Sequence, residues 1–296
     1  RQMITSLVPW VRSRETFGVA IGHRELVQRR LGRLAARVIG CDAVLAWSTG
    51  LLDAGYRCEL EGVVAKVFST EALKEATVDL LLKTHGGRAL LDGNLFADQV
   101  HELLAPAVFE GENEILTLGF FAGLAREHGE GVLQPLTRAL GAGDGQPAVT
   151  ERVSRLWAAR APVTAYATWA GGRQLHRVLA DVRRTVPTDL DGLTDLASGL
   201  LQTCGLEISS AMRHHGVNLI QRQAAVFELA RRAQEAAVML VVSRYGARQA
   251  DPLARDAASC MAAELGQRLT AARPAAAYHR MLTGLGAAVA EGRFDR

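Results

Sequence analysis

The stretch that decides the fold is "ELVQRRLGRLAARVIGCDAVLAWSTGLL", residues 25–52. Its apolar side chains recur at intervals of three and four residues, the spacing that gathers side chains on one face of an α-helix. The members of this face are Leu26, Val27, Leu31, Leu34, Val38, Ile39, Val44, Trp47 and Leu51. The pattern predicts one long amphipathic helix that ends at "DAG", residues 53–55.

The same periodicity continues along most of the chain. A second helix is predicted from near Glu61 to "HGG" at residues 85–87, and a third from Glu112 to about His128. Further helices are predicted at about residues 149–182, 188–213, 217–246, 251–273 and 275–291. No stretch shows a convincing strand-like alternation of apolar and polar residues. Because helices joined by short turns pack as neighbours, we expect an all-α protein of two successive antiparallel helix bundles.

A segment rich in Gly, Pro and Asp, "GEGVLQPLTRALGAGDGQPAV", begins at residue 129. Such a composition is typical of a linker, so we predict a first domain at residues 1–128, a linker at 129–148 and a C-terminal helical extension at 149–296. The opening residues "ITSLVPWVRSRETFG" (4–18) have the pattern of the end of a helix whose beginning is absent. We therefore expect the first domain to be truncated at its N-terminus.

Composition limits the function classes. The chain has 296 residues, of which 49% are hydrophobic, enough for a large buried core. A net charge of only +3 gives no polyelectrolyte signature, so nucleic acid is not an expected partner. No uninterrupted apolar run reaches the roughly 18–20 residues that span a bilayer, and the start lacks the apolar core of a signal peptide.

The cysteines suggest a reducing compartment. Cys41, Cys58, Cys204 and Cys260 are far apart and form no Cys-x-x-Cys pair, so neither a metal site nor a disulfide framework is expected. His214 and His215 lack the spacing of a metal-binding helix pair and fit a solvated helix end. The expected location is the cytoplasm.

Three short motifs follow one another in the first domain: "RETFG" at residues 14–18, "KTHGG" at 83–87 and "FEGENEI" at 109–115. Together they resemble the C-terminal helical half of flavin-dependent acyl-CoA dehydrogenases, whose forms are Arg-x-x-Phe-Gly, Gln-Ile-His-Gly-Gly and Tyr-Glu-Gly-Thr-x-x-Ile. Their order and the spacing of 23 residues from Gly87 to Glu110 are similar to the family's. The resemblance covers about residues 1–127.

This resemblance implies a set of partners. They are FAD as cofactor, an acyl thioester as substrate, an electron-transferring flavoprotein as acceptor, and a homodimer or higher oligomer. It also implies that the N-terminal half of the enzyme, as a separate or cleaved chain, supplies most of the contacts to FAD and substrate.

The tail carries a second resemblance. "VVSRYGARQADPLARDAASCMAAELGQRL", residues 241–269, is similar to the extra C-terminal region of the very-long-chain acyl-CoA dehydrogenases, which form homodimers and associate with membrane surfaces. The resemblance allows a weak membrane-surface contact at "RVLADVRRTV", residues 177–186, or in the linker. A solvated face of the bundle explains these basic residues more simply, because the apolar side is needed for the core.

Glu110 follows an apolar stretch and precedes a helix. One interpretation is a helix-start glutamate favoured by the macrodipole. The resemblance implies instead the catalytic base that removes the α-proton of the acyl thioester, since an acyl chain that displaces water makes a carboxylate more basic. We adopt the catalytic interpretation.

The resemblance assigns the other motif residues to the flavin. Arg14, Thr16 and Phe17 are expected to reach the adenine and pyrophosphate of the neighbouring subunit's FAD. Gly86 and Gly87 would let backbone amides approach a phosphate, although a plain helix stop explains them equally well.

Two of the expected flavin-binding positions depart from the family's pattern. Lys83 replaces a glutamine and could add a phosphate contact. Glu112 replaces a threonine and would oppose a pyrophosphate unless it points away. With Glu114, they complete the predicted flavin-binding set.

The predicted function is therefore α,β-dehydrogenation in fatty acid metabolism, with Glu110 as base. Two alternatives stay open: a dehydrogenase of acyl groups tethered to a carrier protein in a biosynthetic pathway, and an interaction subunit that keeps the fold without catalysis.

Overall fold

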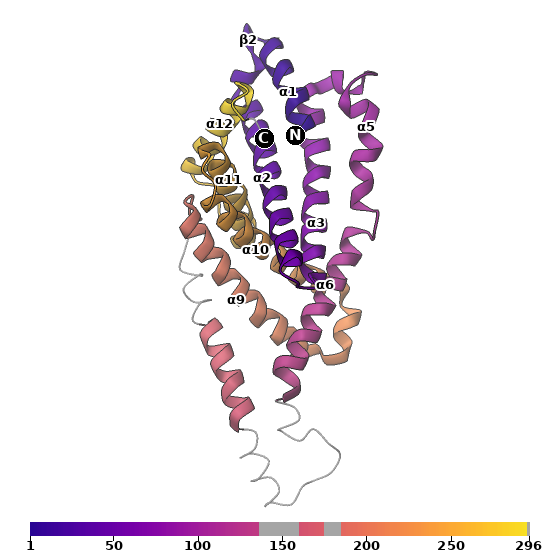
Figure 1. Ribbon diagram of the computed structural model, residues 1–296, viewed down its shortest axis with the longest axis vertical. Coiled ribbons are helices and arrows are strands. Elements are labelled where there is room, and N and C mark those ends of the chain that lie inside the picture. Colours follow the sequence, from indigo (N-terminus) through magenta and orange to yellow (C-terminus); the bar gives the residue numbers. More distant parts are fainter. Residues whose placement is uncertain (136–159, 175–184, 295–296) are drawn as a thin grey trace, which may run out of the picture. The chain divides into compact units, whose positions relative to one another are not determined.

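The computed structural model describes residues 1–135, 160–174 and 185–294. Helices dominate these residues, and their only strands are the two-residue pair β1 (Glu15–Thr16) and β2 (Val19–Ala20). Figure 1 shows the individual helices. The predicted all-α class is confirmed.

The N-terminal part contains four longer helices and several short turns of helix. The longer ones are α1 (Gln2–Ser13), α2 (Glu25–Asp53), α3 (Glu59–Glu75) and α5 (Leu95–Leu104). A 3₁₀ turn, η1 (Ile21–His23), precedes α2, and α3 continues without a break through the π-helix η2 (Ala76–Leu82) into α4 (Lys83–His85). The 3₁₀ turns η3 (Gly86–Leu90) and η4 (Ala105–Ala107) lie on either side of α5.

The rest of the chain is also helical where it is described. The elements are α6 (Asn113–His128), the π-helix η5 (Gly129–Leu133), residues 160–174, α9 (Leu190–His215), η6 (Gly216–Gln221), α10 (Gln223–Ala247), α11 (Pro252–Thr270) and α12 (Ala276–Ala290). Two local signals start α11: the Asp251 carboxylate accepts a hydrogen bond from the backbone N–H of Leu253, and Pro252 occupies the first helical position.

The chain folds into two compact units. One contains Arg1–Thr117, Arg184–Ser198 and Gln234–Arg296, and the other contains Leu118–Arg183 and Gly199–Ala233. These units are not consecutive along the chain, and the division predicted at residues 128 and 149 stays a prediction. Residues 129–135 of the predicted linker are helical, and its remainder lies outside the described residues.

Helix α2 is the centre of the first unit. It packs against α3 and also against α11 and α12, which flank it in Figure 1. Its predicted apolar face supplies core residues such as Leu31, Leu34 and Ile39. Among the described residues α2 alone is long and apolar enough to cross a membrane by length and composition, and half of its most apolar window is buried inside the fold. That burial is what a core helix requires.

Glycines allow α2 and α12 to cross at very short range. A Cβ atom added to Gly286 would lie 1.7 Å from the carbonyl oxygen of Gln28, and one added to Gly32 would lie 2.2 Å from that of Leu282. Both obstacles are backbone atoms, which cannot rotate away as a flexible side chain can. The close contact between α12 and α2 therefore requires a glycine on each helix, Gly286 and Gly32.

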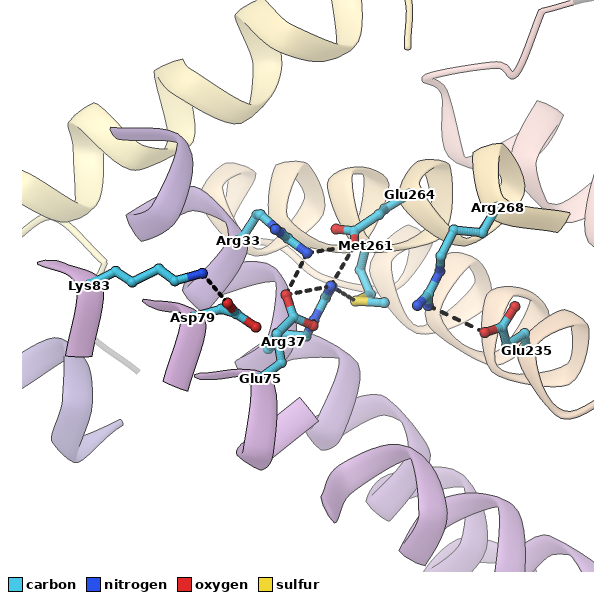
Figure 2. A network of polar contacts seen from close by, with 9 residues as sticks. All are labelled: Arg33, Arg37, Glu75, Asp79, Lys83, Glu235, Met261, Glu264 and Arg268. Atoms are coloured by element: carbon cyan, nitrogen blue, oxygen red, sulfur yellow. Dashed lines mark hydrogen bonds and ion pairs between the residues drawn. The ribbon is translucent and has the colours of Figure 1, made fainter. Parts of the chain in front are cut away.

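A buried ion cluster joins three helices of this unit (Figure 2). Arg37 on α2 is only 4% exposed and donates hydrogen bonds to Glu75 on α3 at 2.9 Å and to Glu264 on α11 at 2.5 Å. Arg33, one turn earlier, pairs with the same two carboxylates. Burial raises the pKa of Glu264, but the charge of Arg37 and its hydrogen bond outweigh this effect and leave the pKa lowered.

The helix predictions compare well with these elements. The helix predicted from residues 25–52 is confirmed as α2, and the one predicted to end at "HGG" is confirmed as the continuous run from α3 to α4. The β1–β2 hairpin was missed, because two-residue strands leave no alternating pattern in the sequence.

The close crossing predicts a contrast between two glycines on α12. Gly286→Ala should destabilise the protein by several kcal/mol, on the order of the cost of overpacking a core, because its methyl group would overlap the Gln28 carbonyl. Gly284→Ala meets no atom within 4 Å and should be neutral or slightly stabilising through its higher helix propensity. Chemical denaturation of both variants measures the difference, and equal stabilities would contradict the crossing.

The ion cluster predicts a stability loss that depends on pH. Arg37→Met leaves two partly buried carboxylates without their main partner and should cost about 3–5 kcal/mol at neutral pH. Because the pKa of folded Glu264 is lowered, its stabilisation is present above the unfolded pKa and is lost as pH falls through the folded one. The difference in the free energy of unfolding between wild type and Arg37→Met, measured by denaturant titration, should therefore decrease as the pH is lowered.

The matched control for this variant is Arg293→Met. Arg293 pairs with Glu291 at 2.7 Å, but both side chains are about 60% exposed. An exposed pair of this kind is worth less than about 1 kcal/mol. A loss as large as that of Arg37→Met, or a gap that does not change with pH, would count against the assigned role of the cluster.

Candidate functional site

The first motif forms the tip of a hairpin. Helix α1 ends at Ser13, Arg14 turns the chain into an extended conformation, and Thr16 pairs with Val19 across the two strands. The turn residues Phe17 (φ 51°) and Gly18 (φ 74°) both have left-handed backbones, as a two-residue hairpin turn requires. Phe17 is 97% exposed.

Phenylalanine is unfavourable in this position for two reasons: its backbone is left-handed, and its apolar ring is exposed to water. Arg24 stabilises the hairpin through two contacts. Its guanidinium donates a hydrogen bond to the carbonyl oxygen of Thr16 and lies 5.7 Å from the ring centre of Phe17. The hairpin is thus a supported arm that presents an aromatic ring outward, which fits contact with another molecule.

The second motif ends the α3–α4 helical run. Gly86 has φ 64° and ψ −145°, a conformation that is accessible essentially to glycine alone. A Cβ atom added to Gly86 or Gly87 would meet no atom within 4 Å, so the backbone here faces open space. Lys83 forms an ion pair with Asp79 one turn earlier on the same helix.

Helix α1 brings these two motifs together through Trp10. The indole Nε1 donates to the carbonyl oxygen of Thr84 at 3.1 Å, and the Ser6 hydroxyl lies 3.0 Å from His85 Nε2. The guanidinium carbons of Arg14 and Arg88 lie 5.9 and 4.8 Å from the Trp10 ring centre. Burial, and to a lesser extent the charge of Arg88, lower the pKa of His85.

The third motif is a tight turn fixed to α3. Glu110 (φ 59°) and Gly111 (φ 107°) both have left-handed backbones. The Lys66 ammonium of α3 donates to the Gly111 carbonyl oxygen at 2.7 Å and to Asn113 Oδ1 at 2.8 Å. The buried Asn113 in turn donates to Glu71 at 2.8 Å. Lys66 and Asn113 therefore hold a turn in which Glu110 is exposed.

Glu112 is the residue that caps α6. Its Oε2 accepts hydrogen bonds from the backbone N–H groups of Glu114 at 2.8 Å and Ile115 at 3.2 Å. Glu110, in contrast, is exposed and has neither a hydrogen bond nor an ion pair among the described residues. Exposed apolar side chains surround it in sequence: Val108, Phe109 and Ile115. The side chain of Glu114 is also exposed.

The predicted residues thus form two groups. The hairpin and the Gly86 turn meet at Trp10, while the Glu110 turn is fixed at Lys66. Twenty helical residues separate Lys66 from Gly86 along α3, η2 and α4, which corresponds to roughly 30 Å at about 1.5 Å per residue. The structure does not bring Glu110 together with Arg14, Thr16 and Phe17 in one chain.

Four supporting residues were missed in the sequence: Trp10, Lys66, Arg88 and Asn113. Lys66 interrupts the apolar face "VVAKVF", residues 63–68, and a charge on a face predicted to be buried is a signal that could have been used. Trp10 and Arg88 gave no such signal, because their relation depends on α1 lying beside α4.

Comparison with known families supports the sequence resemblance. Residues 1–122 match the family model described as acyl-CoA dehydrogenase, C-terminal domain. No curated protein was found to match the chain.

Solved structures share the fold over 98% of the chain. The acyl-CoA dehydrogenase complexed with FAD from Bacillus anthracis matches with a TM-score of 0.67 and 15% identity, and acyl-CoA oxidase 1 from Yarrowia lipolytica with 0.64 and 13%. Acyl-CoA oxidase 3 from Yarrowia lipolytica matches with a TM-score of 0.59 and 14% identity. The chain spans 52%, 46% and 44% of these three structures, respectively.

The capping geometry predicts different effects for the two glutamates. Glu112→Ala should lower the free energy of unfolding by about 0.5–2 kcal/mol, because two N–H groups of α6 lose their acceptor. Glu112→Gln keeps an acceptor and should lose less, while Glu110→Gln should change stability little. Denaturant titrations of the three variants test the assignment, and a larger loss for Glu110→Gln than for Glu112→Ala would reverse it.

Proposed function

We propose that this chain is the C-terminal helical part of an FAD-dependent acyl-CoA dehydrogenase and that Glu110 removes the α-proton of the acyl thioester. The observation that carries the proposal is the Glu110 turn: a carboxylate without a partner among the described residues, held in a fixed left-handed turn by Lys66 and Asn113. The family match over residues 1–122 supports it.

The surroundings of Glu110 suit a base. In water the carboxylate is ionised and solvated, and Val108, Phe109 and Ile115 beside it offer apolar surface to an acyl chain. An acyl chain on this surface would displace water, make the carboxylate more basic and leave the substrate α-proton as its nearest partner. Because Lys66 is occupied by Gly111 and Asn113, no ammonium group competes for Glu110.

The hairpin and the Gly86 turn fit FAD. The residues are an exposed arginine, an exposed aromatic ring and a glycine backbone in open space, which suit a diphosphate and an adenine. FAD, when bound, supplies the acceptor for the hydride that leaves the β-carbon. Arg14, Thr16, Phe17, Gly86 and Gly87 would hold its ADP part, whereas the paired Lys83 and the capping Glu112 are turned to other partners.

The separation of the two groups supports an oligomer. Since Glu110 and Phe17 lie far apart along one chain, each chain would contribute its base to one flavin and its hairpin to another. We propose a homodimer in which the hairpin reaches the partner's cofactor, with the N-terminal half of the enzyme completing each site. We also propose an electron-transferring flavoprotein as acceptor.

The decisive variant is Glu110→Gln in the flavin-loaded protein assembled with the N-terminal half. Glutamine keeps the size of the side chain but cannot accept the proton, so reduction by acyl-CoA should slow by about two to four orders of magnitude. The measurement is anaerobic bleaching of the flavin absorbance after mixing with acyl-CoA.

Glu127→Gln is the control, because it changes an exposed carboxylate of α6 that is not among the predicted site residues. It should bleach at the wild-type rate with the same FAD content. Bleaching of Glu110→Gln at the wild-type rate would show that the base lies elsewhere. A wild-type assembly that holds no FAD would show that the chain belongs to a non-catalytic subunit.

A further inference from the structure

Two arginines share one indole ring beside the Gly86 turn. The guanidinium of Arg88 lies 4.8 Å from the Trp10 ring centre and that of Arg14 lies 5.9 Å from it. Trp10 is itself held by its hydrogen bond to the carbonyl oxygen of Thr84, four residues before Arg88. Stacking on a fixed ring restricts the long side chains, so less entropy is lost when they bind a ligand.

Neither arginine is neutralised within the described part of the chain. No carboxylate pairs with Arg14 or Arg88, and both side chains are exposed. The nearby Lys83 differs, because Asp79 pairs with it. The lowered pKa of His85, to which the charge of Arg88 contributes, agrees with an uncompensated cation at this place.

The space beside these arginines is open to a ligand. No atom lies within 4 Å of a Cβ position at Gly86 or Gly87, the two residues before Arg88. A ligand can therefore approach the backbone closely beside Arg88, the residue that follows Gly87. A diphosphate matches this arrangement, since each planar guanidinium can donate two parallel hydrogen bonds to one phosphate group.

We propose that Arg88, held by Trp10 together with Arg14, is a second arginine that binds a diphosphate beside the Gly86 turn, and that this diphosphate belongs to FAD or to coenzyme A. The inference rests on the proposed function for the identity of the ligand, because both FAD and coenzyme A contain an adenosine diphosphate. Arg88 takes the position next to the glycine turn that Lys83 cannot serve while it is paired with Asp79. It is a binding residue and takes no part in proton removal.

The test compares nucleotide binding by the full chain and by its assembly with the N-terminal half. Isothermal titration calorimetry with ADP and AMP measures how much the second phosphate contributes to affinity. Titrations with FAD and coenzyme A show which of these two molecules supplies the diphosphate. Arg88→Met should weaken ADP by about ten- to a hundredfold and AMP much less, as expected for the loss of charge-assisted hydrogen bonds. Arg88→Lys keeps the positive charge but lacks the planar guanidinium, so its affinity for ADP should lie between those of wild type and Arg88→Met.

Arg280→Met is the matched control, because Arg280 is an exposed arginine of α12 without an ion pair in the described residues. It should leave all four titrations unchanged. A parallel loss for FAD assigns the diphosphate to the flavin, and a loss confined to coenzyme A assigns it to the substrate; either supports the proposal.

Two results separate this proposal from the proposed function. If Arg88→Met binds ADP, FAD and coenzyme A like wild type while acyl-CoA still bleaches the flavin, the role of Arg88 is wrong and the dehydrogenase stands. If wild type binds ADP through Arg88 but no FAD and shows no bleaching, the diphosphate site stands and the dehydrogenase is wrong. Absence of ADP, FAD and coenzyme A binding in wild type would overturn the diphosphate site.

Discussion

The burial of Arg37 is the constraint on which the first unit depends. A guanidinium that is 4% exposed cannot lose its charge, so the fold must place carboxylates beside it. Those carboxylates come from α3 (Glu75) and α11 (Glu264), helices that are far apart in the sequence. The ion cluster ties both helices to the same turns of α2.

The position of α3 determines the geometry of the candidate site at both ends. Lys66, nine residues before Glu75 on the same helix, holds the Glu110 turn, and the continuation of α3 through η2 and α4 delivers the Gly86 turn to Trp10. The π-helix η2 lies between them, and π-helical insertions are frequent near functional sites because they shift the following residues around the helix. A single helical run therefore separates the Glu110 turn from the Gly86 turn.

The sequence was sufficient to predict the features that depend on neighbouring residues in the chain. The spacing of apolar residues gave α2, and the motif order located the three turns around Phe17, Gly86 and Glu110. It was insufficient where the outcome depends on another helix. Gly286 could be recognised as a close-packing residue only once the Gln28 carbonyl was known to lie against it, and Trp10 could be connected to Arg88 only once α1 lay beside α4. The prediction also weighed Glu110 as the helix cap, because sequence does not distinguish which carboxylate turns back onto the helix.

The departures from the family's pattern have a physical explanation in these contacts. A threonine is a good N-cap residue, so replacing it by Glu112 preserves a side-chain oxygen that accepts the first N–H groups of α6. Its negative charge is attracted to the positive end of the helix dipole, which turns it away from any phosphate. Lys83 likewise directs its charge to Asp79. The exposed cation next to the Gly86 turn is then Arg88, which pairs with no carboxylate in the described part of the chain. Substitutions that look opposed to anion binding in the sequence thus leave two exposed arginines beside Trp10.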